Sequence, residues 1–329
     1  MKNSTSALCL LLATVVNVSA SVSSRIEFIL PLKLYGAHLV VVRGGLGELG
    51  EQNLLIDTGA YPSAIDVEVA RKLHLQVNPG KSRALGQNIA AGAAIIPQVE
   101  IGPVAAKGLP VVVEDLSPLS RDLGVRIDGL IGLDVLARAN FHIDYVEKEL
   151  AFGDPVRLAL AVPIEAQSAM ALVLMRVNGH DIHLLLDTGA ATTVLFAQRV
   201  PYLAWDKYSG QHFTSLSGHL FLARVKSASA EIGALKIDAA NVFLVDGSNM
   251  ATLPFDGIMA TWTQHRHRIA FDFEHSVFSW DSDEIPPHTS PPATWTATSQ
   301  QDAPAMEGDS FVMDRTGSFE RDRSMGDSR

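Results

Sequence analysis

The chain has 329 residues, of which 47% are hydrophobic and 19% charged, and its formal net charge is −10. This length gives room for roughly two domains, and the hydrophobic content excludes a globally disordered chain. The acidic balance and the lack of a Lys/Arg run argue against a nucleic-acid-binding surface.

Residues 1–20 have the features of a signal peptide for export. Lys2 provides a short positive start, residues 7–18 are apolar but too short to span a bilayer comfortably, and Val18-Ser19-Ala20 offers small residues for cleavage. An uncleaved N-terminal anchor is the alternative. We expect no integral membrane span after signal removal, because no later segment has the apolar length of a membrane helix.

The only cysteine, Cys9, lies inside this predicted signal. The mature chain would therefore contain no disulfide, no zinc–thiolate site and no cysteine nucleophile. Export without disulfides favours a bacterial periplasm over a eukaryotic secretory route.

The next part of the chain is predicted to be rich in β-strands. Residues 26–42 are dense in β-formers, and the glycines of residues 44–47 indicate a hairpin turn. Residues 54–60 are an apolar run that ends in Asp57-Thr58-Gly59-Ala60, which predicts a buried strand delivering a carboxylate to a tight turn.

A short helix, more strands and a second buried strand follow. Residues 66–74 are predicted to be helical with Asp66 as the N-cap. Residues 83–113 suit several short strands joined by hairpins, one of which could cover a cleft. Residues 128–136 predict a buried strand that runs into a short helix, and residues 141–152 predict a hairpin.

The second half of the chain repeats this order. Residues 171–177 and 182–186 predict two strands joined by a turn, and the second of them leads into Asp187-Thr188-Gly189-Ala190. Residues 196–203 take the place of the first helix, although Pro201 shortens it. The stretch 256–260 corresponds to residues 128–132, so the chain contains an internal duplication of roughly 120–130 residues.

These patterns predict five parts. They are the signal peptide, 1–20; a first lobe, 21–153; a linker, 154–162; a second lobe, 163–282; and a polar C-terminal tail, 283–329, that we expect to be disordered.

Two aspartates that meet at one place have a defined chemistry. Like charges about 3 Å apart cannot both ionise cheaply, so such a pair holds one proton between its members. The ionised member can deprotonate a water, and the protonated member can donate to a carbonyl oxygen or a leaving amine. Water then attacks an amide without a metal or a covalent intermediate. We therefore expect no cofactor and no metal.

The repeated motifs resemble the retropepsin/pepsin superfamily of aspartic proteases, in a bacterial, exported, tandem form, over about residues 30–281. The resemblance implies that Asp57 and Asp187 are the catalytic pair. It implies that the residues supporting the pair are Thr58, Gly59, Thr188, Gly189, Ser63 and Thr193. It also implies that an apolar element crosses beneath each carboxylate, namely Leu130, Ile131 and Gly132 in the first lobe and Ile258, Met259 and Ala260 in the second.

The chain departs from the family pattern at two places. Ala260 stands where glycine is expected, which puts the close packing of the second lobe in doubt. No tyrosine occurs in residues 83–113, which favours a retropepsin-like rather than a pepsin-like cover over the cleft.

Other polar clusters have plainer interpretations. Residues 265–268 alternate His and Arg, which is typical of a solvated turn. His180 and His183 lack a third metal ligand nearby in sequence. Asp144 and Asp272 occupy matching positions in the two halves and are expected to end strands or to accept backbone hydrogen bonds. Serine hydrolysis would need a Gly-x-Ser-x-Gly elbow, which the chain does not contain.

We therefore expect an all-β fold with a few short helices, in which two retropepsin-like lobes are related by a pseudo-two-fold axis with a cleft between them. The expected protein is a monomeric aspartic endopeptidase of the bacterial envelope that acts on a peptide or protein substrate. Three alternatives stay open. One is a non-catalytic envelope protein that binds peptides by strand addition, one is a hydrolase of a non-peptide amide, and one is an architecture of two beads that each pair with another chain.

Overall fold

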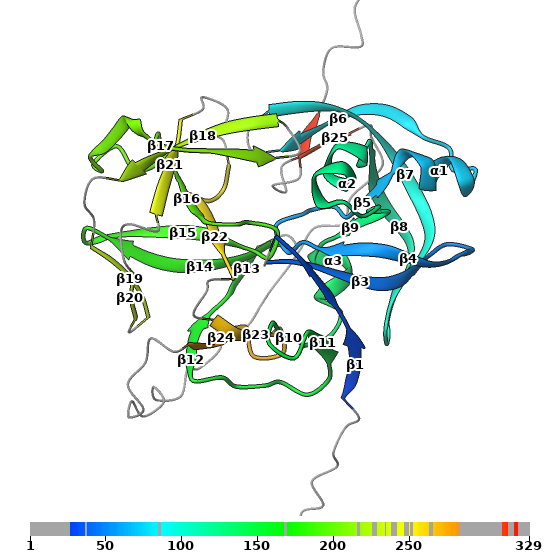
Figure 1. Ribbon diagram of the computed structural model, residues 1–329, viewed down its shortest axis with the longest axis horizontal. Coiled ribbons are helices and arrows are strands. Elements are labelled where there is room, and N and C mark those ends of the chain that lie inside the picture. The colour runs from blue at the N-terminus through cyan, green and yellow to red at the C-terminus, as the bar shows by residue number, and fades with distance from the viewer. Residues whose placement is uncertain are drawn as a thin grey trace, which may run out of the picture.

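The computed structural model describes residues 27–36, 38–84, 87–167, 170–215, 218–225, 229–233, 235–237, 242–246, 250, 253–262, 266–282, 311–314 and 319–321. The predicted signal peptide, residues 1–20, lies outside the described residues. Figure 1 shows two β-rich lobes side by side, with a third sheet below and between them.

The first lobe is built on one long sheet in which parallel and antiparallel pairs are mixed. Its strand order is β2-β3-β4-β9-β5-β8-β7-β6-β25-β26. The bounds are β2 (Lys33–Tyr35), β3 (Leu39–Leu46), β4 (Leu49–Ile56), β5 (Ala64–Asp66), β6 (Asn78–Ala84), β7 (Gln87–Ile101), β8 (Val104–Glu114), β9 (Gly129–Ile131), β25 (Phe311–Asp314) and β26 (Phe319–Arg321).

The second lobe repeats this arrangement. Its strand order is β17-β18-β21-β16-β22-β15-β14-β19-β20, and β13 pairs with β14 beside this path. The bounds are β13 (Glu165–Gln167), β14 (Met170–Val177), β15 (His180–Asp187), β16 (Thr193–Phe196), β17 (Trp205–Ser215), β18 (Gly218–Val225), β19 (Ala230–Ile232), β20 (Leu235–Ile237), β21 (Val242–Val245) and β22 (Gly257–Ala260).

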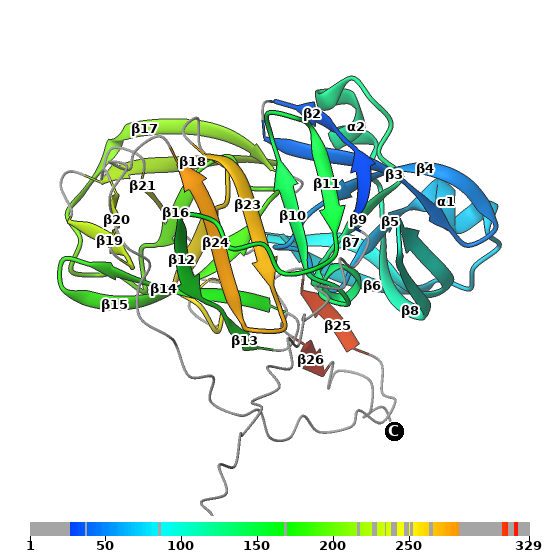
Figure 2. The same ribbon diagram turned by 90° about the horizontal axis from the view of Figure 1, so that it is seen from below.

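A third sheet joins the lobes (Figure 2), with the order β1-β11-β10-β23-β24-β12. Its strands are β1 (Phe28–Pro31), β10 (Phe141–Asp144), β11 (Glu149–Phe152), β12 (Leu160–Pro163), β23 (Arg266–Asp272) and β24 (Val277–Ser282). The hairpin of the first lobe meets that of the second where β10 pairs with β23, and there Phe141 stacks on Phe271 with ring centroids 4.8 Å apart. The two lobes therefore pair within one chain, which resolves the two-bead alternative. The stretch 154–162, expected to be a linker, contributes the start of β12.

A continuous hydrophobic core runs through both lobes and the sheet between them. It includes Ile56 and Leu186, the last apolar residues before the two Asp-Thr-Gly motifs, together with Phe271 and Trp280 of the joining sheet, all almost fully buried. Alternate residues of the two apolar runs (Leu54, Ile56, Leu184 and Leu186) belong to this core, so the strands that lead to the two aspartates are held in a common frame. Leu55 and Leu185 pack in two further clusters.

The described residues form short helices: α1 (Val67–Lys72), α2 (Ser117–Leu123) and α3 (Leu133–Leu136). The predicted N-cap is confirmed, because the Asp66 carboxylate accepts the Glu68 N–H at 3.0 Å. The helix expected around residues 196–203 is wrong: the chain there forms turns after β16, and Pro201 cannot donate the backbone hydrogen bond that a helix needs. In the described part of the chain, no helix has the length and apolar character needed to cross a membrane.

The tail that we expected to be disordered, residues 283–329, lies mostly outside the described residues. The structure describes two short strands in it: β25 pairs in parallel with β6, and β26 pairs with β25.

Candidate active site

The two Asp-Thr-Gly motifs lie at the ends of equivalent strands. In the first lobe β4 pairs in parallel with β9, and in the second lobe β15 pairs in parallel with β22. The side chains of residues 54–56 and 184–186 are buried, because each strand lies inside its sheet and is covered on both faces. Each apolar run thus carries one aspartate, Asp57 or Asp187, to the place where the lobes meet.

A reciprocal set of hydrogen bonds joins the two motifs across the lobes. The Thr58 hydroxyl accepts the Thr188 N–H at 3.1 Å and donates to the Leu186 carbonyl oxygen at 2.8 Å. The Thr188 hydroxyl accepts the Thr58 N–H at 3.0 Å and donates to the Ile56 carbonyl oxygen at 2.8 Å. Both threonines are buried. Four bonds at normal lengths therefore hold the two aspartate loops in register.

The glycine of each motif faces the carboxylate of the other lobe. A Cβ built at Gly59 would lie 2.6 Å from Asp187 Cγ, and one built at Gly189 would lie 3.1 Å from Asp57 Cγ. Each carboxylate also accepts the N–H of its own glycine: Gly59 donates to Asp57 at 3.1 Å and Gly189 donates to Asp187 at 2.6 Å. The structure thus brings the two aspartates together on a close backbone approach that only glycine permits.

The surroundings of Asp187 favour its protonated form. Burial raises the pKa of Asp187 well above its ordinary value, and the charge of Asp57 and a hydrogen bond with Asp57 raise that pKa further. The N–H groups of Gly189 and Ala190 act in the opposite direction but do not cancel the rise. Asp187 therefore holds a proton under conditions in which an exposed aspartate is ionised.

The two apolar elements of the prediction pair with the strands that lead to Asp57 and Asp187, but they differ between the lobes. Leu130 and Ile131 lie in β9, and Gly132 follows, where a Cβ would lie 2.0 Å from the Ala60 carbonyl oxygen. In the second lobe Ile258, Met259 and Ala260 all lie in β22.

Ala260 fits because its strand does not turn at that residue. Ala260 is 3% exposed and pairs with Asp187, and the Thr261 N–H then donates to the Asp187 carbonyl oxygen at 3.1 Å. In the first lobe, by contrast, the chain turns at Gly132 into α3. The doubt about packing at Ala260 is therefore resolved by an extended strand.

Ser63 and Thr193 lie at matching positions but in different surroundings. Ser63 is fully buried: its hydroxyl donates to Asp134 Oδ1 at 2.5 Å and accepts the Gly132 N–H at 2.9 Å. The Ser63 N–H donates to Asp134 Oδ2 at 2.9 Å. Thr193 begins β16 and is half-buried.

Asp134 is a residue whose role sequence reasoning missed. The matching position of the second lobe is Trp262, whose ring lies 6.0 Å from that of His38 in the first lobe. Aligning the two repeats could have revealed this residue, because an indole at the matching position cannot accept the hydrogen bonds that the Asp134 carboxylate accepts. Hydrogen bonds to the Asp134 carboxylate therefore fix the loop that follows Asp57, and the matching position of the second lobe has no carboxylate.

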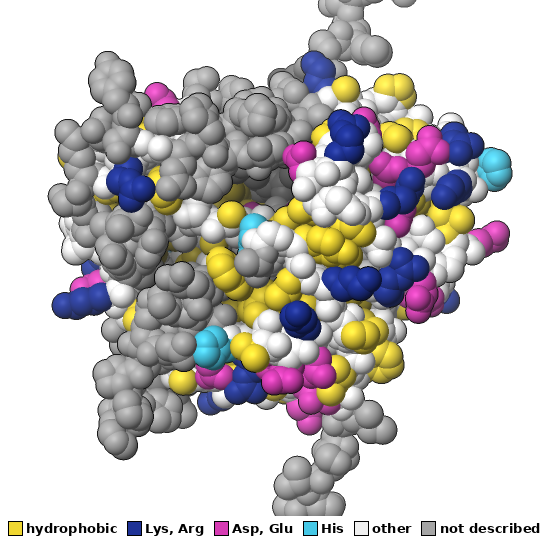
Figure 3. All heavy atoms as spheres, in the orientation of Figure 1, with side chains coloured by type: hydrophobic (Ala, Val, Ile, Leu, Met, Phe, Trp, Pro, Cys, Tyr) yellow, Lys and Arg dark blue, Asp and Glu magenta, His cyan; other side chains and the backbone are white. Residues whose placement is uncertain are grey.

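Each lobe has a hairpin at the place expected for a cover. These are β6–β7 in the first lobe and β17–β18 in the second, and Figure 1 shows them on the upper side of the two lobes, opposite the joining sheet. In the space-filling view of Figure 3, hydrophobic side chains gather along the boundary between the lobes. Lys and Arg side chains are interspersed with Asp and Glu on the described part of the first lobe in that view.

The remaining polar candidates have structural partners. Asp144 accepts the N–H groups of Val146 and Glu147 at 2.9 and 2.8 Å, and Asp272 accepts the His275 N–H at 2.9 Å, so the expectation for both aspartates is confirmed.

The histidines weighed as metal ligands are engaged elsewhere. His180 stacks on Tyr202 with ring centroids 4.0 Å apart, and His183 lies 3.3 Å from Glu165. Within the described ranges, no group of three or more His, Cys, Asp or Glu side chains could hold a metal ion. The solvated turn expected for residues 265–268 is wrong for its described part, because residues 266–268 begin β23, where Arg268 forms an ion pair with Asp281 at 2.7 Å. Residue 265 lies outside the described residues.

A comparison with protein-family models finds the aspartyl protease family twice, over residues 42–135 and 173–260. The chain belongs to the aspartyl protease family. Each match includes one Asp-Thr-Gly motif and the apolar element that crosses beneath it, so membership in the family covers both lobes and accounts for the two-fold fold. A comparison with curated proteins found no match.

Proposed function

We propose that this protein is an aspartic endopeptidase that hydrolyses peptide bonds with a water activated between Asp57 and Asp187. The observation that carries the proposal is the reciprocal approach of Gly59 to the Asp187 carboxylate and of Gly189 to the Asp57 carboxylate. Asp57 and Asp187 are also joined by a side-chain hydrogen bond, and each accepts an N–H of its own loop, which supports a proton shared between them.

In the proposed mechanism the two aspartates differ in protonation. We assign the proton to Asp187, since burial and the neighbouring charge raise its pKa, and the role of general base to Asp57. Asp57 removes a proton from water as the water oxygen attacks the peptide carbonyl carbon, while Asp187 donates its proton to the carbonyl oxygen. Asp57 then donates this proton to the leaving amine as the C–N bond breaks, while Asp187 takes a proton back from a hydroxyl group of the gem-diol as the carboxyl product forms. The pair thus returns to one shared proton.

The proposed substrate is an extended peptide or protein segment that lies between the lobes. The hairpins β6–β7 and β17–β18 lie on the side opposite the joining sheet, so they are placed to cover such a segment from both lobes. Backbone pairing with a hairpin would give affinity that does not depend on sequence, and side-chain contacts would set the preference.

Hydrolysis is tested by incubating the protein with a denatured, unbiased peptide mixture from pH 3 to pH 8. The parent protein is compared with Asp57→Asn and Asp187→Asn, with and without a statine-type inhibitor, and Asp144→Asn serves as a control carboxylate in the joining sheet. Cleavage should disappear in both active-site variants and with the inhibitor. Cleavage that survives in either variant contradicts the shared pair. Inhibitor binding without cleavage at any pH would point instead to a protein that only binds peptides.

We further propose that the protein is exported to a bacterial periplasm and acts there as a monomer. Export rests on the sequence of residues 1–20, and a mature N-terminus near residue 21 together with periplasmic recovery would support it. A single chain that supplies both aspartates needs no partner for the pair, so the molecular mass in solution should be that of one chain.

A further inference from the structure

Two carboxylates outside the pair bind the strands that carry it. Asp128 Oδ2 accepts the Asn53 N–H at 3.0 Å, while the Asp128 N–H donates to the Asn53 carbonyl oxygen at 2.9 Å. Asp256 does the same with His183, at 2.9 and 2.8 Å. Each aspartate thus closes a two-bond ring on the residue just before the apolar run that leads to Asp57 or Asp187.

These rings lie at the start of short parallel pairings. Strand β9 pairs with β4 from Leu54 to Ile56, and the next bond along the chain is from the Asp57 N–H to the Ile131 carbonyl oxygen at 2.9 Å. A slip of one residue would turn every side chain of β4 to the opposite face. The two bonds at Asn53 and the bond at Asp57 lie at opposite ends of the β4–β9 pairing. Asp128 therefore fixes the register of β4, and with it the position of Asp57.

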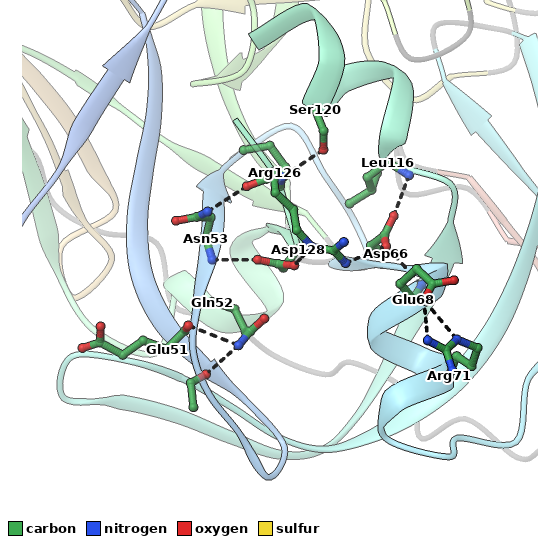
Figure 4. A network of polar contacts seen from close by, with 12 residues as sticks. Glu51, Gln52, Asn53, Asp66, Glu68, Arg71, Leu116, Ser120, Arg126 and Asp128 are labelled. Atoms are coloured by element: carbon green, nitrogen blue, oxygen red, sulfur yellow. Dashed lines mark hydrogen bonds and ion pairs between the residues drawn. The ribbon is translucent and has the colours of Figure 1, made fainter. Parts of the chain in front are cut away.

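Each carboxylate lies beside an arginine. Arg126 Nε lies 2.5 Å from Asp128 Oδ1, and Arg126 also reaches Asp66 at 3.2 Å (Figure 4). Arg199 Nε lies 3.0 Å from Asp256 Oδ1. The Asp128 side chain is only 5% exposed, so its charge needs such a partner.

The arginines do not correspond in the duplication. Arg126 precedes Asp128 by two residues, and the matching place in the second lobe is Pro254. Arg199 comes instead from the turn after β16. The repeat explains why both lobes have the aspartate, but it does not explain why both have the arginine. An arginine lies beside the aspartate in both lobes although it comes from different positions of the repeat. This indicates that the carboxylate of Asp128 or Asp256 must be fixed in each lobe.

We propose that Asp128 and Asp256 are positioning residues for peptide hydrolysis, each holding the register of the strand that presents one member of the Asp57/Asp187 pair. The inference rests on the proposed function for its effect on turnover. Its structural part, the fixed register, can be measured without turnover.

The test compares Asp128→Ala and Asp256→Ala with Asp144→Ala and Asp272→Ala. The second pair is a matched control: these carboxylates also correspond in the duplication and also accept backbone N–H groups, but they end strands β10 and β23 of the joining sheet. The melting temperature is measured for each variant, and kcat and KM are measured on the best-cleaved peptide at a temperature where all four remain folded.

We expect the first pair to lower kcat on the order of 10- to 100-fold with little change in KM, as a displaced catalytic group does. The control variants should stay within about threefold at a similar loss of melting temperature. Asp128→Asn should recover most of the lost kcat, because its amide oxygen can still accept the Asn53 N–H. An equal loss of kcat in the control pair would overturn the proposal.

Deuterium uptake by peptides covering residues 54–60 and 184–190 gives the second readout. Uptake should rise over 54–60 in Asp128→Ala and over 184–190 in Asp256→Ala, and over neither in the controls. If the parent protein hydrolyses no peptide, the proposed function fails. The deuterium uptake still shows whether Asp128 and Asp256 fix the register of the two strands. Unchanged uptake in Asp128→Ala and Asp256→Ala would overturn the inference whatever the activity.

Discussion

Gly59 of the first lobe lies so close to Asp187 of the second that a Cβ at residue 59 would lie 2.6 Å from the Asp187 carboxyl carbon. The reciprocal approach, of Gly189 to Asp57, is looser at 3.1 Å. The contact joins backbone on one side to the Asp187 side chain on the other, so a methyl group at residue 59 would have to move either the Asp187 carboxylate or the loop. Because residues 59 and 189 have no side chain, the two lobes can approach this closely at the aspartate pair.

Replacing Gly59 with alanine should separate the pair without unfolding the protein. The added methyl group must displace the Asp187 carboxylate or the loop, and a displacement of about 1 Å can cost on the order of 100-fold in rate. Gly189→Ala should lose less, because its neighbour lies farther away. Peptide cleavage rates and melting temperatures of the two variants check this order. Equal rates for Gly59→Ala and the parent would contradict the assigned geometry.

Gly132 and Ala260 offer a reciprocal pair of substitutions. Gly132→Ala places a methyl group 2.0 Å from the Ala60 carbonyl oxygen, so overpacking should destabilise the protein by about 1–3 kcal/mol or more. Ala260→Gly removes one methyl group from an extended strand and should cost about 0.5–1 kcal/mol. Urea unfolding of both variants measures the difference. A greater loss for Ala260→Gly would mean that the strand at Ala260 is not held as described.

The threonine bonds should couple the two lobes in stability. Thr58→Val leaves the Thr188 N–H and the Leu186 carbonyl group buried without their partner, at roughly 1–3 kcal/mol for each group. Thr58→Ser keeps the hydroxyl and should lose only about 1 kcal/mol.

A double-mutant cycle with Thr188→Val tests the coupling. Because the two hydroxyls lie in one network, the losses should not add. Additive losses in the free energy of unfolding would show that the Thr58 and Thr188 hydroxyl groups act independently.

The raised pKa of Asp187 predicts how stability depends on pH. Since the folded chain holds a proton that the unfolded chain releases near pH 4, this residue favours folding most below that pH and progressively less as pH rises toward its folded pKa. Asp187→Asn does not titrate. Its free energy of unfolding relative to the parent should therefore rise over this window, by up to about 1.4 kcal/mol per pH unit.

Chemical unfolding of the parent and of Asp187→Asn at several pH values between 4 and 8 measures this effect. Asp57→Asn should reduce the pH dependence, because it removes the charge that raises the pKa of Asp187. A difference that falls with rising pH would contradict the direction of the shift.

Much of the fold could be predicted from local patterns. The apolar runs before Asp57 and Asp187, the capped helix at Asp66 and the matching hairpins at Asp144 and Asp272 each report burial or turn geometry over a few residues, which short sequence patterns encode directly. Their repetition made the two-lobe architecture a firm expectation.

The differences between the lobes could not be predicted in this way. Asp134 reaches Ser63 only because the chain turns at Gly132, while the strand at Ala260 continues. Arg199 reaches Asp256 from a position that has no counterpart in the first lobe. Such contacts join residues far apart in sequence, and their existence depends on how whole strands are packed.

The sequence by itself therefore determined that two buried strands each deliver an aspartate to a glycine turn, because hydrophobic runs and turn residues act locally. Only the tertiary structure decided that both aspartates of the chain meet at one site. The pairing of β10 with β23 and the bonds between Thr58 and Thr188 bring the lobes together, and both depend on register across more than 100 residues of chain.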